Sequence, residues 1–375
     1  MLYLDHAATG LPRAPGVAEA MVRALGQANP GRSGHAGSLE AARTVYGARE
    51  VLARYLGVSD PRRVLFTAGC TAAINTVLFG LLRPGQHVVT TALEHNAVAR
   101  PLRDLERQRR ITLDVIPVDP AGRVDPAAFG RAAEDADLAV VNHVSNVSGT
   151  IQDLATLREA TRGVPLLVDG AQGLGLLPCD FDGLGLDYLA VPGHKGFHGP
   201  PGIGALVISN TTRLPEPLIH GGTGSRSERD EQPGFLPDGY EAGTQNLPGI
   251  AGLAAAVAAT EAVGIEALRD GEIVRMARFL DGLQGLPGIR LLGPAEPAHR
   301  TAVFGLVIDG MDPGTAALRL EREHGIQGRA GLQCAPWAHR AFGTFPGGTL
   351  RLSFGPQDTP EDVDRTLAAL EVLCR

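Results

Sequence analysis

Residues 188–196 read Tyr-Leu-Ala-Val-Pro-Gly-His-Lys-Gly, an apolar run that ends in a lysine bracketed by glycines. Lys195 is the only lysine in the 375-residue chain, although lysine and arginine together number 34. Arginine cannot replace a lysine that must lose its proton, because a guanidinium stays charged in proteins. We therefore expect Lys195 to be a reactive amine at the end of a strand. A surface turn lysine retained by chance is the alternative.

Similar apolar runs alternate with amphipathic stretches between residues 60 and 210. The predicted strands are Val64–Thr67, His87–Thr91, Thr112–Pro117, Leu138–His143, Leu166–Val168, Tyr188–Val191 and Ala205–Ile208. The helices predicted between them include Thr71–Leu82, Val98–Arg109, Pro126–Glu134 and Leu154–Thr161. This alternation favours an α/β fold with a mostly parallel sheet covered on both faces.

The pattern changes beyond residue 248. We expect an alanine-rich helix over Gly249–Val263, a second helix over Ile265–Gly282, several short strands, and a last helix over Pro360–Leu373 with Thr359 as its N-cap. The polar segment Ser225–Pro237 is expected to be a mobile loop. The predicted organisation is a large domain over residues 16–248 and a smaller α+β domain formed by residues 1–15 and 249–375.

Composition argues against several functional classes. Hydrophobic residues make up 44% and no run of eighteen apolar residues occurs, so we expect a soluble protein without a membrane span. The net charge of −7 offers no basic surface for nucleic acid. The four cysteines are too scattered for a disulfide framework or a metal site, so no metal is expected. Free thiols and the absence of a leader-like N-terminus predict a cytoplasmic location.

Polar residues also follow the predicted strand Leu166–Val168. Asp169 ends it, and a carboxylate buried there requires a cationic partner. The carboxyl ends of strands in open α/β sheets are where ligands bind. Pyridoxal 5′-phosphate (PLP) would need an amine such as Lys195 and an acidic partner for its ring nitrogen, with Gln172 placed to contact the ring hydroxyl. A turn cap is the alternative role for Asp169.

Three further motifs fit the same interpretation. Residues 68–75, Ala-Gly-Cys-Thr-Ala-Ala-Ile-Asn, open a helix whose N–H groups and Thr71 hydroxyl could bind a phosphate, although the loop is not a Walker A motif. His95 follows the strand His87–Thr91 and could stack on a flat ring or be a buried structural histidine. Cys334 follows Arg329, a cation that would favour its thiolate. Core packing is the alternative for this cysteine.

Together these motifs resemble class V aminotransferase-fold PLP enzymes, specifically the cysteine desulfurase and selenocysteine lyase family. The resemblance covers nearly the whole chain, in order and spacing: residues 3–9, 94–96, 143–146, 168–172, 193–195, 240–246 and 329–335. It implies the PLP-dependent transferase fold of type I and a homodimer with shared active sites. The short Arg-x-Gly-x-x-Cys-Ala loop is similar to that of group-II desulfurases.

The resemblance also implies a role for individual residues. Lys195 would carry PLP as a Schiff base and later take the α-proton of L-cysteine, and Cys334 would accept its sulfur as a persulfide. A sulfur-acceptor protein is a further possible partner. The implied cofactor-binding residues are Cys70, Thr71, His95, Asp169, Gln172, His194, Lys195 and Thr244, with His95 stacking on the ring as a catalytic residue. The implied substrate-binding residues are Asn146, Arg329 and Arg351.

The sequence departs from the family pattern at three positions. Pro192 stands where Ser or Thr is usual, and Leu332 and Gln333 stand where histidines are common. Selenocysteine lyase, a sulfide-releasing β-lyase and a transaminase are alternatives on the same cofactor, although a transaminase needs no thiol. The alternative from a different functional class is a non-catalytic scaffold for sulfur transfer. Such a scaffold would tolerate arginine at position 195.

Overall fold

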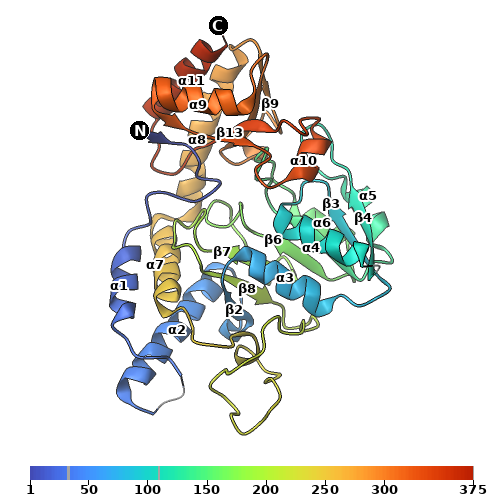
Figure 1. The fold of residues 1–375 in the computed structure, drawn as a ribbon, viewed down its shortest axis with the longest axis vertical. Helices are drawn as coiled ribbons and strands as arrows, with labels where there is room; N and C mark the ends of the chain where they lie inside the picture. The colour runs from blue at the N-terminus through green and yellow to red at the C-terminus, as the bar shows by residue number, and fades with distance from the viewer. Residues whose placement is uncertain (32–33, 109, 375) are drawn as a thin grey trace.

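The computed structural model of the protein describes residues 1–31, 34–108 and 110–374. The large sheet and its helices form the lower part of the molecule in Figure 1, and a smaller sheet with its own helices forms the upper part. Both chain termini lie in the upper part. The N-terminal segment therefore joins the C-terminal third of the chain, and Leu2 and Leu4 pack in the core of the upper part.

The large sheet contains seven strands in the order β2-β8-β7-β6-β5-β3-β4. β8 runs antiparallel to β2 and β7, and the remaining neighbours are parallel. The mostly parallel sheet is thus confirmed, and each predicted strand is present to within one residue at either end. The strands are β2 (Val64–Thr67), β3 (Gln86–Thr91), β4 (Ile111–Ile116), β5 (Leu138–Asn142), β6 (Leu166–Asp169), β7 (Tyr188–Pro192) and β8 (Gly204–Ile208).

Helices cover both faces of this sheet because successive side chains of each strand point to opposite sides. One face packs against α3 (Cys70–Leu81) and α4 (Asn96–Arg107). The other packs against α1 (Val17–Leu25), α2 (Ala36–Tyr55), α5 (Pro126–Ala133), α6 (Leu154–Ala160) and α7 (Leu247–Val263). Of the predicted helix Val98–Arg109, Arg109 lies outside the described residues. Two helices, α1 and α2, were not predicted from the sequence, and their buried faces are rich in alanine.

The small domain is built on an antiparallel sheet in the order β12-β13-β10-β9. Its core includes three phenylalanines, Phe279, Phe304 and Phe354, which contact one another edge to face. The capping box at Thr359 starts the last helix at the predicted position. The elements are β1 (Leu2–Tyr3), α8 (Ile265–Gln284), β9 (Ile289–Leu291), β10 (Val303–Ile308), α9 (Pro313–His324), β11 (Ile326–Gln327), β12 (Arg329–Gly331), α10 (Pro336–Ala341), β13 (Thr349–Ser353) and α11 (Pro360–Leu373).

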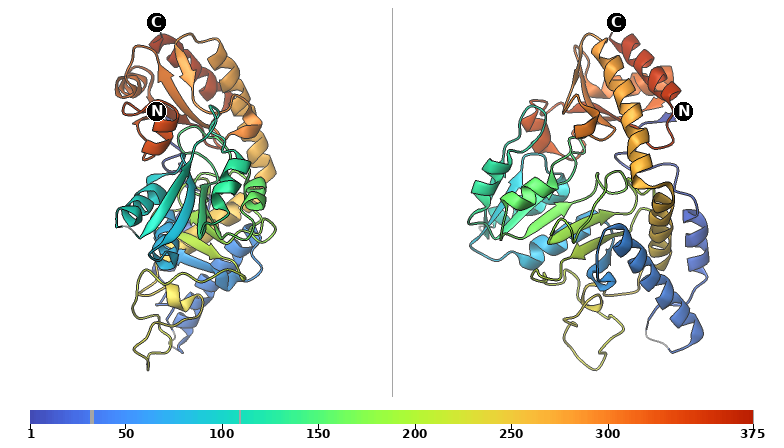
Figure 2. Two further views of the ribbon diagram at one scale, coloured as in Figure 1. Left: turned by 90° about the vertical axis from the view of Figure 1, so that its right-hand side faces the viewer. Right: turned by 180° about the vertical axis from the view of Figure 1, so that it is seen from behind.

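We propose that the two domains meet at Gly264 rather than at residue 249. α7 buries Leu253 and Val257 in the core of the large domain, whereas α8 buries Met276 in the core of the small one. The chain bends by 76° between these helices, and α8 runs upward into the small domain in Figure 2. Two consecutive helices separated by one glycine leave no sequence signal for such a boundary.

A buried arginine connects the two domains near the site. Arg300 is fully buried, and its guanidinium donates hydrogen bonds to the carbonyls of Pro294 (2.6 Å), Ser148 (2.9 Å) and Val303 (2.6 Å). Gly149 has φ +74°, and a Cβ there would lie 2.5 Å from the Val303 carbonyl oxygen. These contacts fix residues 145–150, the loop after β5, against the small domain.

Within the described ranges, no single helix has both the length and the apolar composition needed to span a membrane. Only the bent pair α7 and α8 meets those criteria, and only when both helices are taken together. The same residues contain no group of three or more His, Cys, Asp or Glu side chains placed to hold a metal ion.

Candidate active site

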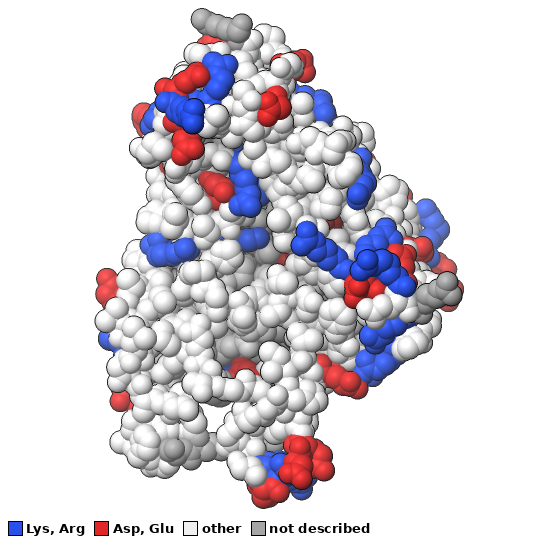
Figure 3. Space-filling model, in the orientation of Figure 1, with Lys and Arg blue, Asp and Glu red and all other residues white. Residues whose placement is uncertain are grey.

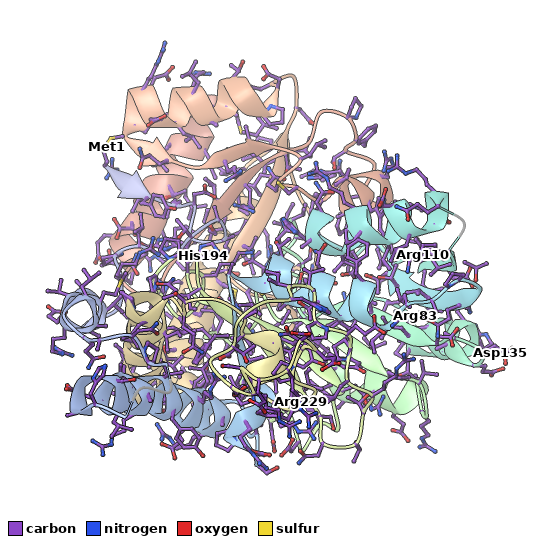
Figure 4. The ribbon with its side chains drawn as sticks, turned by 60° about the horizontal axis from the view of Figure 1, so that its bottom comes forward. Met1, Arg83, Arg110, Asp135, His194 and Arg229 are labelled. Atoms are coloured by element: carbon purple, nitrogen blue, oxygen red, sulfur yellow. The ribbon has the colours of Figure 1, made fainter. Side chains whose placement is uncertain are left out.

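A cavity of about 640 Å³ lies between the two domains, at the carboxyl ends of β6 and β7. Figure 3 shows this face of the molecule hollowed between its upper and lower parts, with basic side chains around the hollow. Figure 4 shows His194 at the junction of the domains, far from Arg83 and Arg110 at the edge of the sheet. The predicted residues that line the cavity are Cys70, Thr71, His95, Asn146, Asp169, Gln172, His194, Lys195, Arg329, Cys334 and Arg351.

Asp169 is the last residue of β6. Lys195 lies just after the end of β7, the parallel strand next to β6. Asp169 is buried, which raises its pKa, while the nearby lysine acts to lower it. Burial lowers the pKa of Lys195, and Asp169 opposes that shift. A lysine with a lowered pKa is neutral more often at physiological pH, as a nucleophilic amine or a proton acceptor must be.

The loop before α3 forms an anion-binding cradle beside Lys195. Gly69 is the N-cap and has no side chain to satisfy the first N–H groups of the helix, which remain available to a ligand. A Cβ at Gly204 would lie 2.8 Å from the Cα of Gly69, so glycine there allows the loop to approach the sheet. Thr71 lines the cavity, and burial together with Asp169 keeps the pKa of Cys70 high, so its thiol is neutral.

His95 is both the N-cap of α4 and a wall of the cavity. Its Nδ1 accepts a hydrogen bond from the Ala97 N–H at 3.0 Å. Burial lowers its pKa to about 4, and Lys195 and Arg351 add to the shift. The ring is therefore neutral at pH 7, and because Nδ1 is an acceptor, the proton lies on Nε2.

The N-terminal segment closes the cavity from the small-domain side. The Gln172 amide donates to the Ala7 carbonyl at 2.8 Å, so part of its hydrogen-bonding capacity is used within the protein. His194 Nδ1 lies 3.1 Å from the Thr9 hydroxyl, and burial lowers the pKa of this histidine to about 4, with Lys195 adding to the shift. The sequence analysis assigned no role to Ala7 or Thr9.

Arg329 and Arg351 form a cationic pair at the opposite end of the cavity. They are direct cross-strand partners on β12 and β13, and the repulsion between their like charges makes this arrangement unfavourable. Asp5 offsets this repulsion: its carboxylate accepts from Arg351 Nη2 at 2.6 Å and lies 3.7 Å from Arg329 Nη1. Among the described residues, the buried Arg351 Nε and Asn146 Oδ1 have no partner. The Nε of Arg351 is a donor, and with the Arg329 guanidinium it makes this corner suited to bind an anion, whereas Asn146 Oδ1 is an acceptor and needs a donor from a ligand.

No role was predicted for Asp5, although it lies in the segment of residues 3–9 that resembles the family. It stands 346 positions before Arg351, so the ion pair has no signature in local spacing. Its one detectable signal was an acidic residue following a short apolar run.

Cys334 is exposed at the mouth of the cavity. Gln333 and Cys334 have φ values of 41° and 57°, a conformation that costs about 1–2 kcal/mol for each residue that is not glycine. The loop is bonded to two walls of the cavity: the Asn96 N–H donates to the Cys334 carbonyl (2.8 Å), and Asn146 Nδ2 donates to the Gln333 carbonyl (2.7 Å). The thiol is thus held on a short and constrained loop.

Thr244 is the one predicted site residue that does not line this cavity. It is exposed, and it borders two neighbouring cavities that also involve Glu241 and Gln245.

The family described as aminotransferase class-V matches residues 2–366 of the chain. The chain belongs to this family. It is 36% identical to a probable cysteine desulfurase of Pseudomonas aeruginosa, over 99% of this chain and 93% of the relative. A solved cysteine desulfurase of Thermococcus onnurineus superposes with a TM-score of 0.92 and 30% identity, covering 100% and 94% of the two chains. An Escherichia coli cysteine desulfurase, solved in an S-sulfonic acid form, gives a TM-score of 0.85 at 28% identity over 99% and 94%.

The depressed pKa of His95 makes the stability of this class-V family member depend on pH. The unfolded chain binds a proton at His95 below about pH 6.5, but the folded chain binds it only below about pH 4. Stability is therefore lost as the pH falls from 6.5 towards 4. His95→Asn retains an N-cap acceptor but has no such titration. We expect the unfolding free energy of the wild type, relative to this variant, to decrease between pH 7 and pH 5.

Denaturant unfolding of the two proteins at each pH measures this difference. The other histidines with lowered pKa are present in both proteins, so their contributions cancel in the comparison. A difference that stays constant from pH 7 to pH 5 would show that the folded chain protonates His95 as readily as the unfolded chain does.

Proposed function

We propose that the protein is a PLP-dependent cysteine desulfurase that converts L-cysteine to L-alanine and retains the sulfur as a persulfide on Cys334. The observation that carries this proposal is the convergence of Lys195, Asp169 and Cys334 on one cavity. A reactive amine with an acidic partner suits amino-acid chemistry on PLP, and the thiol at the mouth suits sulfur capture. The names of the full-length relatives support the same activity.

The residues of the cavity fit PLP by their chemistry. Asp169 offers a buried carboxylate to the ring nitrogen, and Lys195 offers an amine to the aldehyde. The N-terminus of α3 with Thr71, and the neutral His194, would bind the phosphate. When bound, PLP withdraws electrons from the α-carbon of an amino acid and so makes its proton acidic.

The cationic corner would bind and orient the substrate. Arg329 and Arg351 would bind the α-carboxylate of L-cysteine, for which the planar guanidinium of Arg329 offers two parallel N–H donors. Asn146 would contact the substrate from the loop fixed by Arg300. Lys195, with its lowered pKa, would then take the α-proton and hold it at Nζ. His95 keeps a proton at Nε2 beside these groups.

The sulfur step is a nucleophilic displacement at the substrate sulfur. The Cys334 thiolate attacks this sulfur, so that an S–S bond forms and the Cβ–S bond breaks. The electron pair of the broken bond stays with carbon, which is protonated to give the methyl group of alanine. The net change converts L-cysteine and a thiol into L-alanine and a persulfide, without another oxidant or reductant. An acceptor protein or small thiol would then remove the persulfide sulfur.

We also propose that two copies of the chain complete each other's active sites. Thr244 is exposed outside its own Lys195 cavity, and the exposed apolar side chains of Tyr46, Leu218 and Ile219 line the cavities that Thr244 borders. The lower left of the face in Figure 3 carries few charged side chains, whereas charged side chains gather at its lower tip. A twofold dimer would cover this surface and create two equivalent shared sites.

A cytoplasmic location belongs to the same proposal. The cysteines at positions 70, 179, 334 and 374 are all free thiols, which suits a reducing compartment.

Lys195 is the amine on which cofactor binding depends. We expect the purified protein to be yellow, and borohydride followed by proteolysis and mass spectrometry to place the cofactor on the peptide that contains Lys195. Lys195→Ala should lose the covalent attachment while keeping the secondary structure measured by circular dichroism. A colourless wild type that cannot be reconstituted with PLP would refute the cofactor assignment.

Substitution of Cys334 should distinguish a sulfur-transfer reaction from other reactions that use PLP. We expect Cys334→Ser to bind PLP as the wild type does and to show the spectral change on adding L-cysteine, because the thiol takes part in neither event. Persulfide formation and most alanine production should be lost. Cys179→Ser, at a buried position outside the cavity, is the matched control. Alanine release at the wild-type rate in Cys334→Ser would show that Cys334 does not accept the sulfur and would favour a lyase instead, whereas formation of the 2-oxo acid of cysteine would favour a transaminase.

The shared site can be tested by complementation between two inactive variants. Lys195→Ala and Thr244→Arg are mixed under conditions that allow subunit exchange. One site of a mixed dimer then has both native residues, so we expect partial activity to return.

Loss of one hydrogen bond to a charged phosphate, about 1.5–3 kcal/mol, should weaken PLP binding about tenfold to a hundredfold in Thr244→Val. Full activity in a stable monomer would contradict the shared site.

A further inference from the structure

The side chain of Gln333 is buried beneath the Cys334 loop, where both its amide oxygen and its amide nitrogen form hydrogen bonds. Its Oε1 accepts from His339 Nε2 at 2.9 Å and from the Thr349 hydroxyl at 3.2 Å. Its Nε2 donates to the Thr349 carbonyl at 2.9 Å and, more weakly, to the Arg329 carbonyl at 3.4 Å. Only 5% of the residue is exposed, so these bonds have no competition from bulk water.

The surroundings determine both the orientation of the amide and the state of His339. Two backbone carbonyls can only accept, so the amide nitrogen must face them and the amide oxygen must face His339. Burial lowers the pKa of His339 to about 4, so the ring is neutral at pH 7. Its Nε2 carries the proton donated to Gln333, and its Nδ1 accepts from the Thr344 hydroxyl at 2.7 Å.

This hydrogen-bonded network connects the thiol loop to three separate elements. Thr349 begins β13, which carries Arg351, and His339 belongs to α10. Arg329 lies on β12, the cross-strand partner of β13. The strained conformation of Gln333 and Cys334 persists only if the surroundings hold it, and the buried amide provides several bonds at the residue next to the thiol.

We propose that Gln333 is a positioning residue that holds the Cys334 thiol at the mouth of the Lys195 cavity through its hydrogen bonds to His339 and Thr349. The inference rests on the proposed function, in which Cys334 receives the sulfur. It adds that the geometry of sulfur capture depends on a neutral amide beside the thiol. The amide touches Arg329 only through a weak bond to its backbone carbonyl and contacts no guanidinium, so we expect sulfur capture to depend on it far more than substrate binding does.

Two substitutions separate hydrogen bonding from volume. Gln333→Glu keeps the shape of the side chain but turns an oxygen towards the carbonyls of Thr349 and Arg329, where a donor is required. Gln333→Leu removes every bond of the amide. Gln284→Leu is the matched control, because Gln284 is exposed at the end of α8.

The holoenzyme variants are compared in two measurements. The rate of persulfide formation in a single turnover with L-cysteine should fall at least tenfold in both Gln333 variants and stay unchanged in Gln284→Leu. The affinity for L-cysteine, followed by cofactor absorbance in proteins that also carry Cys334→Ala, should stay within twofold of the matching Cys334→Ala protein. Circular dichroism and cofactor content verify that each variant is folded.

The inference is overturned if persulfide forms in both Gln333 variants within twofold of the wild-type rate. It is also overturned if affinity for L-cysteine or cofactor content falls as much as the capture rate, because Gln333 would then support the whole pocket. Failure of the proposed function looks different: Cys334→Ala alone would still produce alanine at the wild-type rate.

Discussion

Asp169 is buried at the end of a central strand, and a carboxylate at that depth needs a positive charge nearby. Lys195, just after the adjacent strand β7, opposes the rise in the pKa of Asp169, and burial lowers the pKa of Lys195 in turn. This mutual dependence holds the two groups together on one cavity. The cradle of α3, the ring of His95 and the N-terminal segment all surround the same two groups, and the cavity is the space that they enclose.

The second constraint is that the two domains must meet with a defined geometry. Lys195 and Asp169 belong to the large domain, whereas Arg329, Cys334 and Arg351 belong to the small one. Buried polar contacts hold the domains together at the site: Arg300 binds the loop that carries Asn146, and Asn146 in turn donates to the Gln333 carbonyl. Polar contacts of this kind are directional, so they fix the position of one domain on the other more closely than apolar burial would.

The cationic corner shows how charge is managed where substrate binding is proposed. Two arginines side by side on neighbouring strands repel each other, and Asp5 compensates them from the far end of the sequence. The compensation is incomplete, because Arg351 Nε has no partner among the described residues. A site that binds a carboxylate must keep such unsatisfied positive charge, and the structure tolerates its cost.

The sequence alone determined the strands of the large sheet, the last helix and the residues at the strand ends. These features depend on local periodicity and on the rule that parallel strands present their carboxyl ends at one edge. The single lysine of the chain marked Lys195 as the candidate amine, and it does line the cavity. Only the tertiary structure decided that Asp5 pairs with Arg351, that Gln333 is held by His339 and Thr349, that α7 packs in the large domain, and that Thr244 lies outside its own cavity. Each of these depends on which distant segments come into contact, and that is settled by packing of the whole chain rather than by spacing along it.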